Sequence, residues 1–342
     1  MNRTIIVIAL TLLFTGSSLV YTIAQCCSGG VPLANNIGGL PIGDKGTFQA
    51  SLSFDGNFLR TLKAGSSTLD DKTRNRTTFS ALLKTAYSFS DKWTVELLVA
   101  GVNQRRKIDG FSGNQDNTET TGIGDMVLMP FFKYYEKNSW QLTGGLGIKI
   151  PIGPSNLRDR GITLNADLQP GSGAWDLLLH HRIVRRLKVR PSTVVTNMVT
   201  YRFTGENPDY LSSQIYEFGS ELQFILGISD QRNFLNQIFR YGLNFRYRHA
   251  NHDRFRLKDT PSNENQTLPN SGGQWVFIMP VLSWYINPDM SIAASGEAPL
   301  FSKVDGTQLT PTFRINVGIF YTINLKKKQN IEINNYDYEF FK

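Results

Sequence analysis

The feature that most constrains this 342-residue chain is an alternation of apolar and polar residues, first seen at residues 48–58 and repeated as far as residue 324. In the first segment the two sets of alternate positions are Phe48, Ala50, Leu52, Phe54 and Phe58 against Gln49, Ser51, Ser53, Asp55 and Asn57. Successive side chains of a β-strand point to opposite faces. A period of two therefore predicts a strand with one apolar face and one polar face.

The same pattern recurs along the rest of the chain. Clear segments lie at residues 79–89, 93–99, 140–150, 189–203, 216–228, 239–248 and 313–324, and weaker ones at 124–135, 174–186, 274–286 and 290–300. With the first segment this makes about twelve strands, many of them longer than the roughly five or six residues of an ordinary globular strand.

The connections between these segments alternate between long polar loops and tight turns. Long loops are expected at residues 63–77, 103–121, 153–173, 205–213, 251–273 and 301–310, and turns at 90–92, 136–139, 185–188, 229–237 and 287–289. Aromatic residues gather beside the turns, at Tyr87, Phe89, Trp93, Tyr134, Tyr135, Trp140, Trp284 and Tyr285. Short periplasmic turns, long external loops and aromatic girdles are typical of outer-membrane barrels.

Two architectures could use such strands. A soluble sandwich or lipocalin-like barrel would bury the apolar face, but strands this long and numerous would leave a wide, unfilled interior. A membrane barrel turns the apolar face to lipid, and its closure leaves no sheet edge unpaired. The sequence therefore predicts an all-β fold, a transmembrane antiparallel up-and-down β-barrel of about 12 strands over residues 47–325.

Composition excludes other classes. Charged residues make up 19% and aromatic residues 12% of the chain, whereas disordered chains have high charge and few aromatic residues. Only one stretch, at the N-terminus, is apolar enough to cross a bilayer as a helix, which excludes a helical bundle. The net charge is +8, but Lys and Arg are scattered without a basic tract, so no nucleic-acid partner is expected.

Residues 1–24 have the features of a cleaved signal peptide. Arg3 supplies the positive charge, residues 5–14 the apolar core, and residues 22–24 a small-x-small cleavage site, which makes Gln25 the first mature residue. The alternative is an uncleaved anchor, whose core would be short against about 30 Å of hydrocarbon. A cleaved signal peptide indicates export, and together with the predicted transmembrane barrel it predicts that the protein resides in the outer membrane.

Two segments flank the predicted barrel. Residues 25–46 are rich in glycine and are expected to form a plug or a linker, and residues 326–342 form a C-terminal tail. The first segment contains the only cysteines, Cys26 and Cys27, for which a vicinal disulfide and a bond to a partner chain remain open, whereas a soft metal site is disfavoured. Residues 16–37 contain no His, Asp or Glu to complete a metal site. No metal or cofactor is expected.

The polar face of the strands would line the lumen, where the function of a barrel resides. The candidate lumen or solute-binding residues are Glu217, Glu221, Arg240, Arg246, Arg248, Arg202, Arg314, Asp125 and Lys149. Neighbouring strands bring opposite charges within cross-strand reach. Two interpretations remain open: an electrostatic constriction that selects solutes, and a ladder of salt bridges that fills the lumen.

Two motifs resemble those of a known family. The segment Thr121-Gly122-Ile123-Gly124-Asp125 precedes a strand, and residues 145–153 read Gly-Leu-Gly-Ile-Lys-Ile-Pro-Ile-Gly at the end of the next strand. Both are similar to strand motifs of the outer-membrane family named for the meta-pathway of phenol degradation. The resemblance implies a barrel linked to the uptake of small, often hydrophobic molecules.

These observations favour an outer-membrane channel or transporter for small solutes, among which hydrophobic ones are one possibility, with a narrow polar lumen and no enzymatic activity. Its expected partners are outer-membrane lipid, a small-molecule solute and, in one interpretation, a periplasmic protein. Two alternatives remain. One is a non-catalytic scaffold that binds a periplasmic partner through residues 26–46 or the tail. The other is a lipid hydrolase, for which His181 would be the lipid-facing candidate.

Overall fold

The computed structural model describes residues 43–110, 115–211, 213–258 and 265–325. The predicted signal peptide, the cysteine pair, the C-terminal tail and most of the glycine-rich segment lie outside the described residues. Among the described residues, no helix has the length and apolarity needed to cross a membrane.

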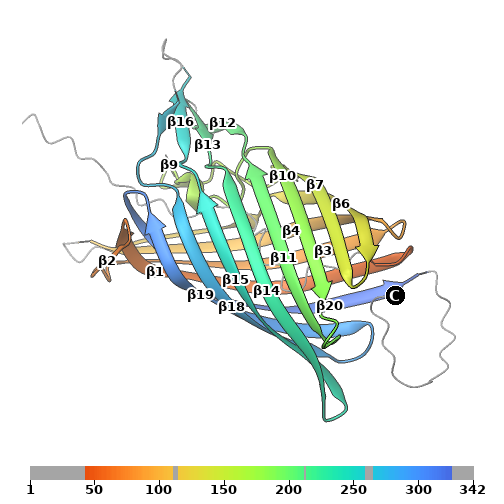
Figure 1. Ribbon diagram of the computed structural model, residues 1–342. Coiled ribbons are helices and arrows are strands. Elements are labelled where there is room, and N and C mark those ends of the chain that lie inside the picture. Colours follow the sequence, from red (N-terminus) through yellow and green to blue (C-terminus); the bar gives the residue numbers. More distant parts are fainter. Residues whose placement is uncertain (1–42, 111–114, 212, 259–264, 326–342) are drawn as a thin grey trace, which may run out of the picture.

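Twelve long antiparallel strands form a closed barrel (Figure 1). They are β1 (Thr47–Ala64), β3 (Arg74–Ser88), β4 (Trp93–Asp109), β6 (Met126–Lys137), β7 (Trp140–Ile150), β10 (Asp176–Arg186), β11 (Thr193–Phe203), β14 (Glu221–Phe234), β15 (Gln237–Ala250), β18 (Gly273–Tyr285), β19 (Met290–Val304) and β20 (Thr307–Asn324). Each strand pairs with the next in this order, and β1 pairs with both β3 and β20. The predicted fold class is therefore confirmed.

Short turns join the strands at one end of the barrel, which we call the turn end. Asn138 and Ser139 connect β6 to β7, and Leu235 and Asn236 connect β14 to β15, all four with positive φ. Two successive residues with positive φ form the hairpin turn whose twist matches that of the flanking strands. The first residues of β1 pair with the last residues of β20 at this same end.

The opposite end, which we call the loop end, carries the longer connections. Small elements form there: β2 (Ser67–Leu69), β5 (Gln115–Ile123), β8 (Arg158–Asp159), β9 (Ile162–Thr163), β12 (Glu206–Leu211), β13 (Gln214–Glu217), β16 (Arg254–Leu257) and β17 (Gln266–Thr267). Strands β12, β13, β16 and β17 form a separate sheet, which we call the cap sheet, at the top of Figure 1.

Several predicted connections are wrong in extent; the loop predicted at residues 63–77, for example, is shortened to residues 65–73, within which β2 forms. Residues 301–310 are not a long loop, because β19 and β20 continue to a two-residue turn at Asp305 and Gly306. Residues 103–121 are largely strand, since β5 pairs with the outer part of β4. Residues 229–237 are strand except for the turn at residues 235–236. Polar residues occupy both faces of the β4–β5 extension, which removes the alternation that reveals a strand in sequence.

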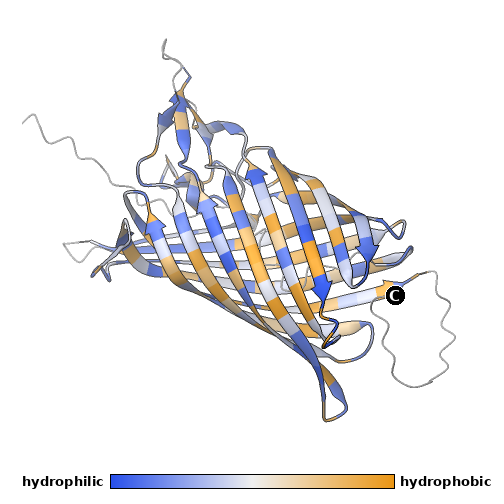
Figure 2. Ribbon diagram, in the orientation of Figure 1, coloured by the Kyte–Doolittle hydropathy of each residue, from blue (hydrophilic) through white to orange (hydrophobic). Residues whose placement is uncertain are grey.

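The faces of the barrel are inverted relative to a soluble protein. Phe54 is 61% exposed, whereas the next residue, Asp55, is 3% exposed. The same inversion holds on the last strand, where Ile315 and Ile319 point outward and Asn316 is buried. Figure 2 shows hydrophobic and hydrophilic positions alternating along the strands. The prediction that apolar side chains face outward is confirmed for these strands.

One part of the interior is apolar, which the sequence interpretation did not predict. The side chains concerned are buried and pack together on β3, β4, β6 and β10; they are Leu82, Leu98, Ala100, Val102, Val127, Met129 and Leu178. We call this cluster the apolar wall. In sequence its signal is a break in the alternation, since the pairs 82–83 and 97–98 are both Leu-Leu. Consecutive apolar residues make both faces of a strand apolar at that level.

Candidate functional site

Charged residues from adjacent strands meet inside the barrel near its loop end. Lys149 on β7 contacts two carboxylates, with Nζ 2.7 Å from Oδ2 of Asp176 on β10 and 3.3 Å from Oδ2 of Asp125, which precedes β6. All three side chains are at most 3% exposed. Asp176 and Lys149 are directly opposite each other in the β7–β10 register, so the backbone pairing itself brings the charges together.

Further ion pairs continue this row of charges along the next strands of the barrel, β11, β14 and β15. Arg202 on β11 is 3.9 Å from Asp176 and 3.5 Å from Glu221 on β14, and Arg248 on β15 is 2.8 Å from the same oxygen of Glu221. The charges therefore alternate in sign from strand to strand. We call this set the ion-pair belt: Asp125, Lys149, Asp176, Arg202, Glu221 and Arg248.

Further buried pairs lie on the remaining strands. Arg246 on β15 pairs with Glu297 on β19, and Arg314 on β20 reaches both carboxylate oxygens of Asp55 on β1 at 2.9 Å. Strand β18, which lies between β15 and β19, presents aromatic rings instead of charges. Arg246 lies over Phe277, and Arg248 lies 4.7 Å from the ring centroid of Trp275. Such contacts stabilise a guanidinium that is removed from water.

The structure brings together seven of the nine predicted site residues in these pairs. Glu217 and Arg240 lie elsewhere. Glu217 is on β13 of the cap sheet, opposite Arg254, because residues 218–220 interrupt the strand that the sequence predicts over 216–228. Arg240 lies nearer the turn end, where it donates to Gln231 and lies over the ring of Tyr285. The predicted role of each residue in solute binding stays a prediction.

The loop between β7 and β10, residues 151–175, folds against the inner face of the barrel, and we call it the mouth loop. It contains a short 3-10 helix, Ala166–Leu168, whose three residues are buried. Arg76 on β3 donates to the Asp167 carboxylate at 2.6 Å and also contacts the Asp167 carbonyl and Gln104 on β4. Thr120 on β5 donates to the Leu168 carbonyl at 2.6 Å. The loop is thus fixed to three strands.

One further contact attaches the mouth loop to the barrel, and another fixes the course of the loop itself, at residues 153 and 171. Ser172 donates to Asp125 from both its amide and its hydroxyl group, which joins the loop to the ion-pair belt. Gly171 lies directly against Gly153, where an added Cβ would be 2.4 Å from the Gly153 oxygen. Real Cβ atoms do not approach an oxygen so closely, so this crossing of two backbones requires glycine.

The cap sheet covers the mouth loop from outside. Tyr210, Tyr216 and Phe218 pack with Ala166 of the 3-10 helix. Burial, and to a smaller extent the negative charge of Asp167, raises the pKa of Tyr210 to about 12. The phenol is therefore neutral, and it donates a hydrogen bond to the Leu164 carbonyl. The cap sheet and the mouth loop therefore form one packed unit over the loop end.

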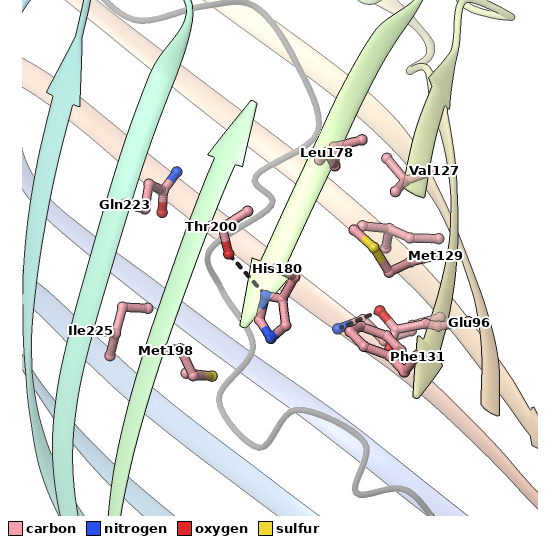
Figure 3. A pocket seen from close by; sticks show the side chains of 12 residues that line it. Glu96, Val127, Met129, Phe131, Leu178, His180, Met198, Thr200, Gln223 and Ile225 are labelled. Carbon is pink, nitrogen blue, oxygen red and sulfur yellow. Dashed lines mark hydrogen bonds and ion pairs between the residues drawn. The ribbon is translucent and has the colours of Figure 1, made fainter. Parts of the chain in front are cut away.

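A small pocket lies deeper in the lumen (Figure 3). Its free volume is about 40 Å3, room for about three water molecules. Residues of the apolar wall form one side, and His180, Met198 and Thr200 approach from β10 and β11. Thr200 lies 2.9 Å from Nδ1 of His180, and Lys84 lies 3.6 Å from Glu96. The pocket combines an apolar surface with a few polar groups, as small-molecule sites generally do.

Sequence reasoning missed the apolar wall, the mouth loop and Arg76. Arg76 and Asp167 are 91 positions apart, and nothing local marks them as a pair. The apolar residues Ala166 and Leu168 inside a polar loop were the available signal that this loop is buried. The lumen is therefore of mixed character rather than polar throughout.

Comparisons with known proteins identify the fold but no family. No family model matches the chain, and no curated protein matches it. Among solved structures, an outer membrane channel from Pseudomonas putida F1 is similar with a TM-score of 0.62 and 15% sequence identity. The match covers 82% of this chain and 97% of that one. At this identity the likeness supports the barrel fold.

Two further solved structures match with lower TM-scores. The β domain of the Bordetella autotransporter BrkA has a TM-score of 0.47 and 8% identity, covering 82% of this chain and 100% of that one. The Pseudomonas putida toluene transporter TodX has a TM-score of 0.44 and 11% identity, covering 82% of this chain and 90% of that one.

Proposed function

We propose that this protein is an outer-membrane channel that passes small solutes with an apolar part. The observation that carries the proposal is the lumen of mixed character, in which the apolar wall on β3, β4, β6 and β10 lies beside the ion-pair belt, most of which is on β7, β10, β11, β14 and β15. In such a lumen the apolar part of a solute can contact the apolar wall, and its polar group can form hydrogen bonds with the ion-pair belt. The family resemblance of the strand motifs and the likeness to an outer membrane channel support the same reading.

The mouth loop and the cap sheet have a defined role in this proposal. Together they narrow the entrance at the loop end, and the contacts of Arg76 with Asp167 hold the loop inward. The ion pairs of the belt balance one another, so the belt supplies a polar surface without a strong net charge. The protein therefore selects solutes by size and apolar contact more than by charge.

The catalytic alternative has little support in the geometry. His181 accepts or donates a hydrogen bond with Tyr134 at 2.6 Å on the outer face. A groove on the outer surface of the barrel adjoins His181, and among the described residues no serine or cysteine that could act as a nucleophile lines it. We therefore propose a role that is not enzymatic.

Planar-bilayer recording of the purified protein tests the proposal. We expect small, discrete conductance steps, and a Met198→Trp variant should lower both the conductance and the flux of small aromatic solutes into liposomes several-fold. Met198 lines the lumen pocket, and an indole would fill the little space present. Val199→Trp is the matched control, because Val199 borders the outer groove instead of the lumen.

Absence of any conductance above the lipid baseline, in the wild type and in variants that release the mouth loop, would contradict the channel. The scaffold alternative would then be favoured. Pull-downs of periplasmic proteins with the full chain, and with residues 26–46 or 326–342 deleted, would test it.

A further inference from the structure

A groove lies on the outer surface of the barrel, on the face that a membrane barrel presents to lipid. It is lined by side chains from β4, β6, β7, β10 and β11, and its free volume is about 640 Å3. Its floor is Gly144, directly opposite Phe132 on one side and His181 on the other. An added Cβ at Gly144 would meet nothing closer than 3.9 Å. The groove thus exists because a row of bulky residues is interrupted by one glycine.

The groove is polar at one end and apolar at the other. Towards the loop end it is bordered by Pro130, Leu146, Leu179 and Tyr201. Towards the turn end stand His181 and Tyr134, whose Nε2 and hydroxyl oxygen are 2.6 Å apart with the rings stacked. Whichever of the two donates to the other, one N–H or O–H donor of the pair remains for a further acceptor.

A positive charge follows the polar pair on the same outer face. Arg185 is four residues beyond His181 on β10 and therefore points to the same side. It is exposed and lies 4.6 Å from the ring centroid of Trp140, directly opposite it on β7. From the centre of the barrel wall to the turn end, the outer face thus presents the apolar surface of the groove, then a hydrogen-bond donor at its edge, then a cation beyond it.

We propose that this groove binds one glycerophospholipid of the periplasm-facing leaflet. An acyl chain lies over Gly144, a phosphate or ester oxygen accepts the hydrogen bond from the His181–Tyr134 pair, and Arg185 faces the phosphate charge. The polarity of the groove matches a lipid whose headgroup is level with the periplasmic turns. The inference rests on the outer-membrane placement given under Proposed function and is independent of solute passage.

Native mass spectrometry of the delipidated protein in detergent tests the site, with phosphatidylethanolamine, phosphatidylglycerol and lipid A added separately. We expect the wild type to retain one phospholipid at low molar excess. Gly144→Leu fills the groove, and the double variant Tyr134→Phe with His181→Phe removes both hydrogen-bond donors while keeping aromatic rings, so each should lower the occupancy about tenfold. Gly144→Ala, whose added methyl group has room, should show a smaller loss with the fold intact.

Gly296→Leu is the matched control, because Gly296 is opposite the outward-facing Ile315 and an added Cβ there also has its nearest neighbour at 3.9 Å. It should bind phospholipid like the wild type. Equal occupancy in the wild type and Gly144→Leu, an equal loss in Gly296→Leu, or a preference for lipid A over phospholipid would overturn the proposal. Conductance should be unchanged in Gly144→Leu, so failure of the lipid site and failure of the channel are separately visible.

Discussion

An Arg76→Ala variant is expected to conduct several-fold more current per channel than the wild type. Arg76 contacts both the carboxylate and the carbonyl group of Asp167 and, through Gln104, the adjacent strand. Its removal leaves the buried Asp167 carboxylate without its cation. Burying a charge without its partner costs more folding free energy than replacing both charges by neutral residues. The mouth loop relieves that cost by moving outward, and the entrance widens. Single-channel recording in planar bilayers measures the effect.

Two further variants make this result specific. Gly171→Val should raise the conductance in the same way, because its side chain cannot fit against Gly153. Arg60→Ala is the control, since Arg60 is exposed and lies over Phe58. An unchanged conductance in both loop variants, with the barrel folded, would show that the mouth loop does not limit passage.

A Lys149→Met variant is expected to lose about 3–5 kcal/mol of unfolding free energy, the usual cost of breaking a buried ion pair from one side. Lys149 is the cation that Asp125 and Asp176 share, and both carboxylates are almost fully buried. Without it two negative charges remain inside the barrel with reduced compensation. Urea unfolding in lipid vesicles, followed by tryptophan fluorescence, measures the loss.

The double variant Lys149→Met with Asp125→Asn tests the reason for that loss. It removes one of the two negative charges together with the cation, so a substantial part of the stability should return. Lys303→Met, at an exposed position on β19, should change the unfolding free energy little. A loss in Lys149→Met that the second substitution does not reduce would contradict the electrostatic explanation and favour lost packing.

The barrel could be predicted because its cause is local and repeated. Each strand carries its own alternation, as at Phe54 and Asp55, and the turn chemistry of Asn138 and Asn236 is also local. The belt could be predicted in part, since pairing of neighbouring strands brings Lys149 opposite Asp176. The sequence predicts Glu217 on the same strand as Glu221, because the alternation of apolar and polar residues continues across residues 218–220. In the structure these three residues are not strand, and Glu217 lies in the cap sheet.

The mouth loop could not be predicted from the same signals. Its position depends on contacts between residues far apart in the chain, such as Thr120 with Leu168 and Asn207 with Ser172. The apolar wall was also missed, although its Leu-Leu pairs break the alternation. An apolar face toward lipid already accounted for the apolar residues of each strand, so none was assigned to the interior. Local periodicity determines the wall of the barrel, whereas long-range packing determines what fills it.

The central claim is that the outward-facing row of apolar side chains on the strands contacts lipid, and that the buried polar side chains between them face the lumen. Spin labels introduced one at a time along residues 315–320 of β20, in a chain whose Cys26 and Cys27 are serine, test it in vesicles. We predict that collisions with oxygen, which concentrates in lipid, peak at Ile315, Val317 and Ile319 and fall at the residues between them. Equal oxygen accessibility at successive positions, or strong accessibility of Ile315, Val317 and Ile319 to a water-soluble nickel complex, would contradict the account.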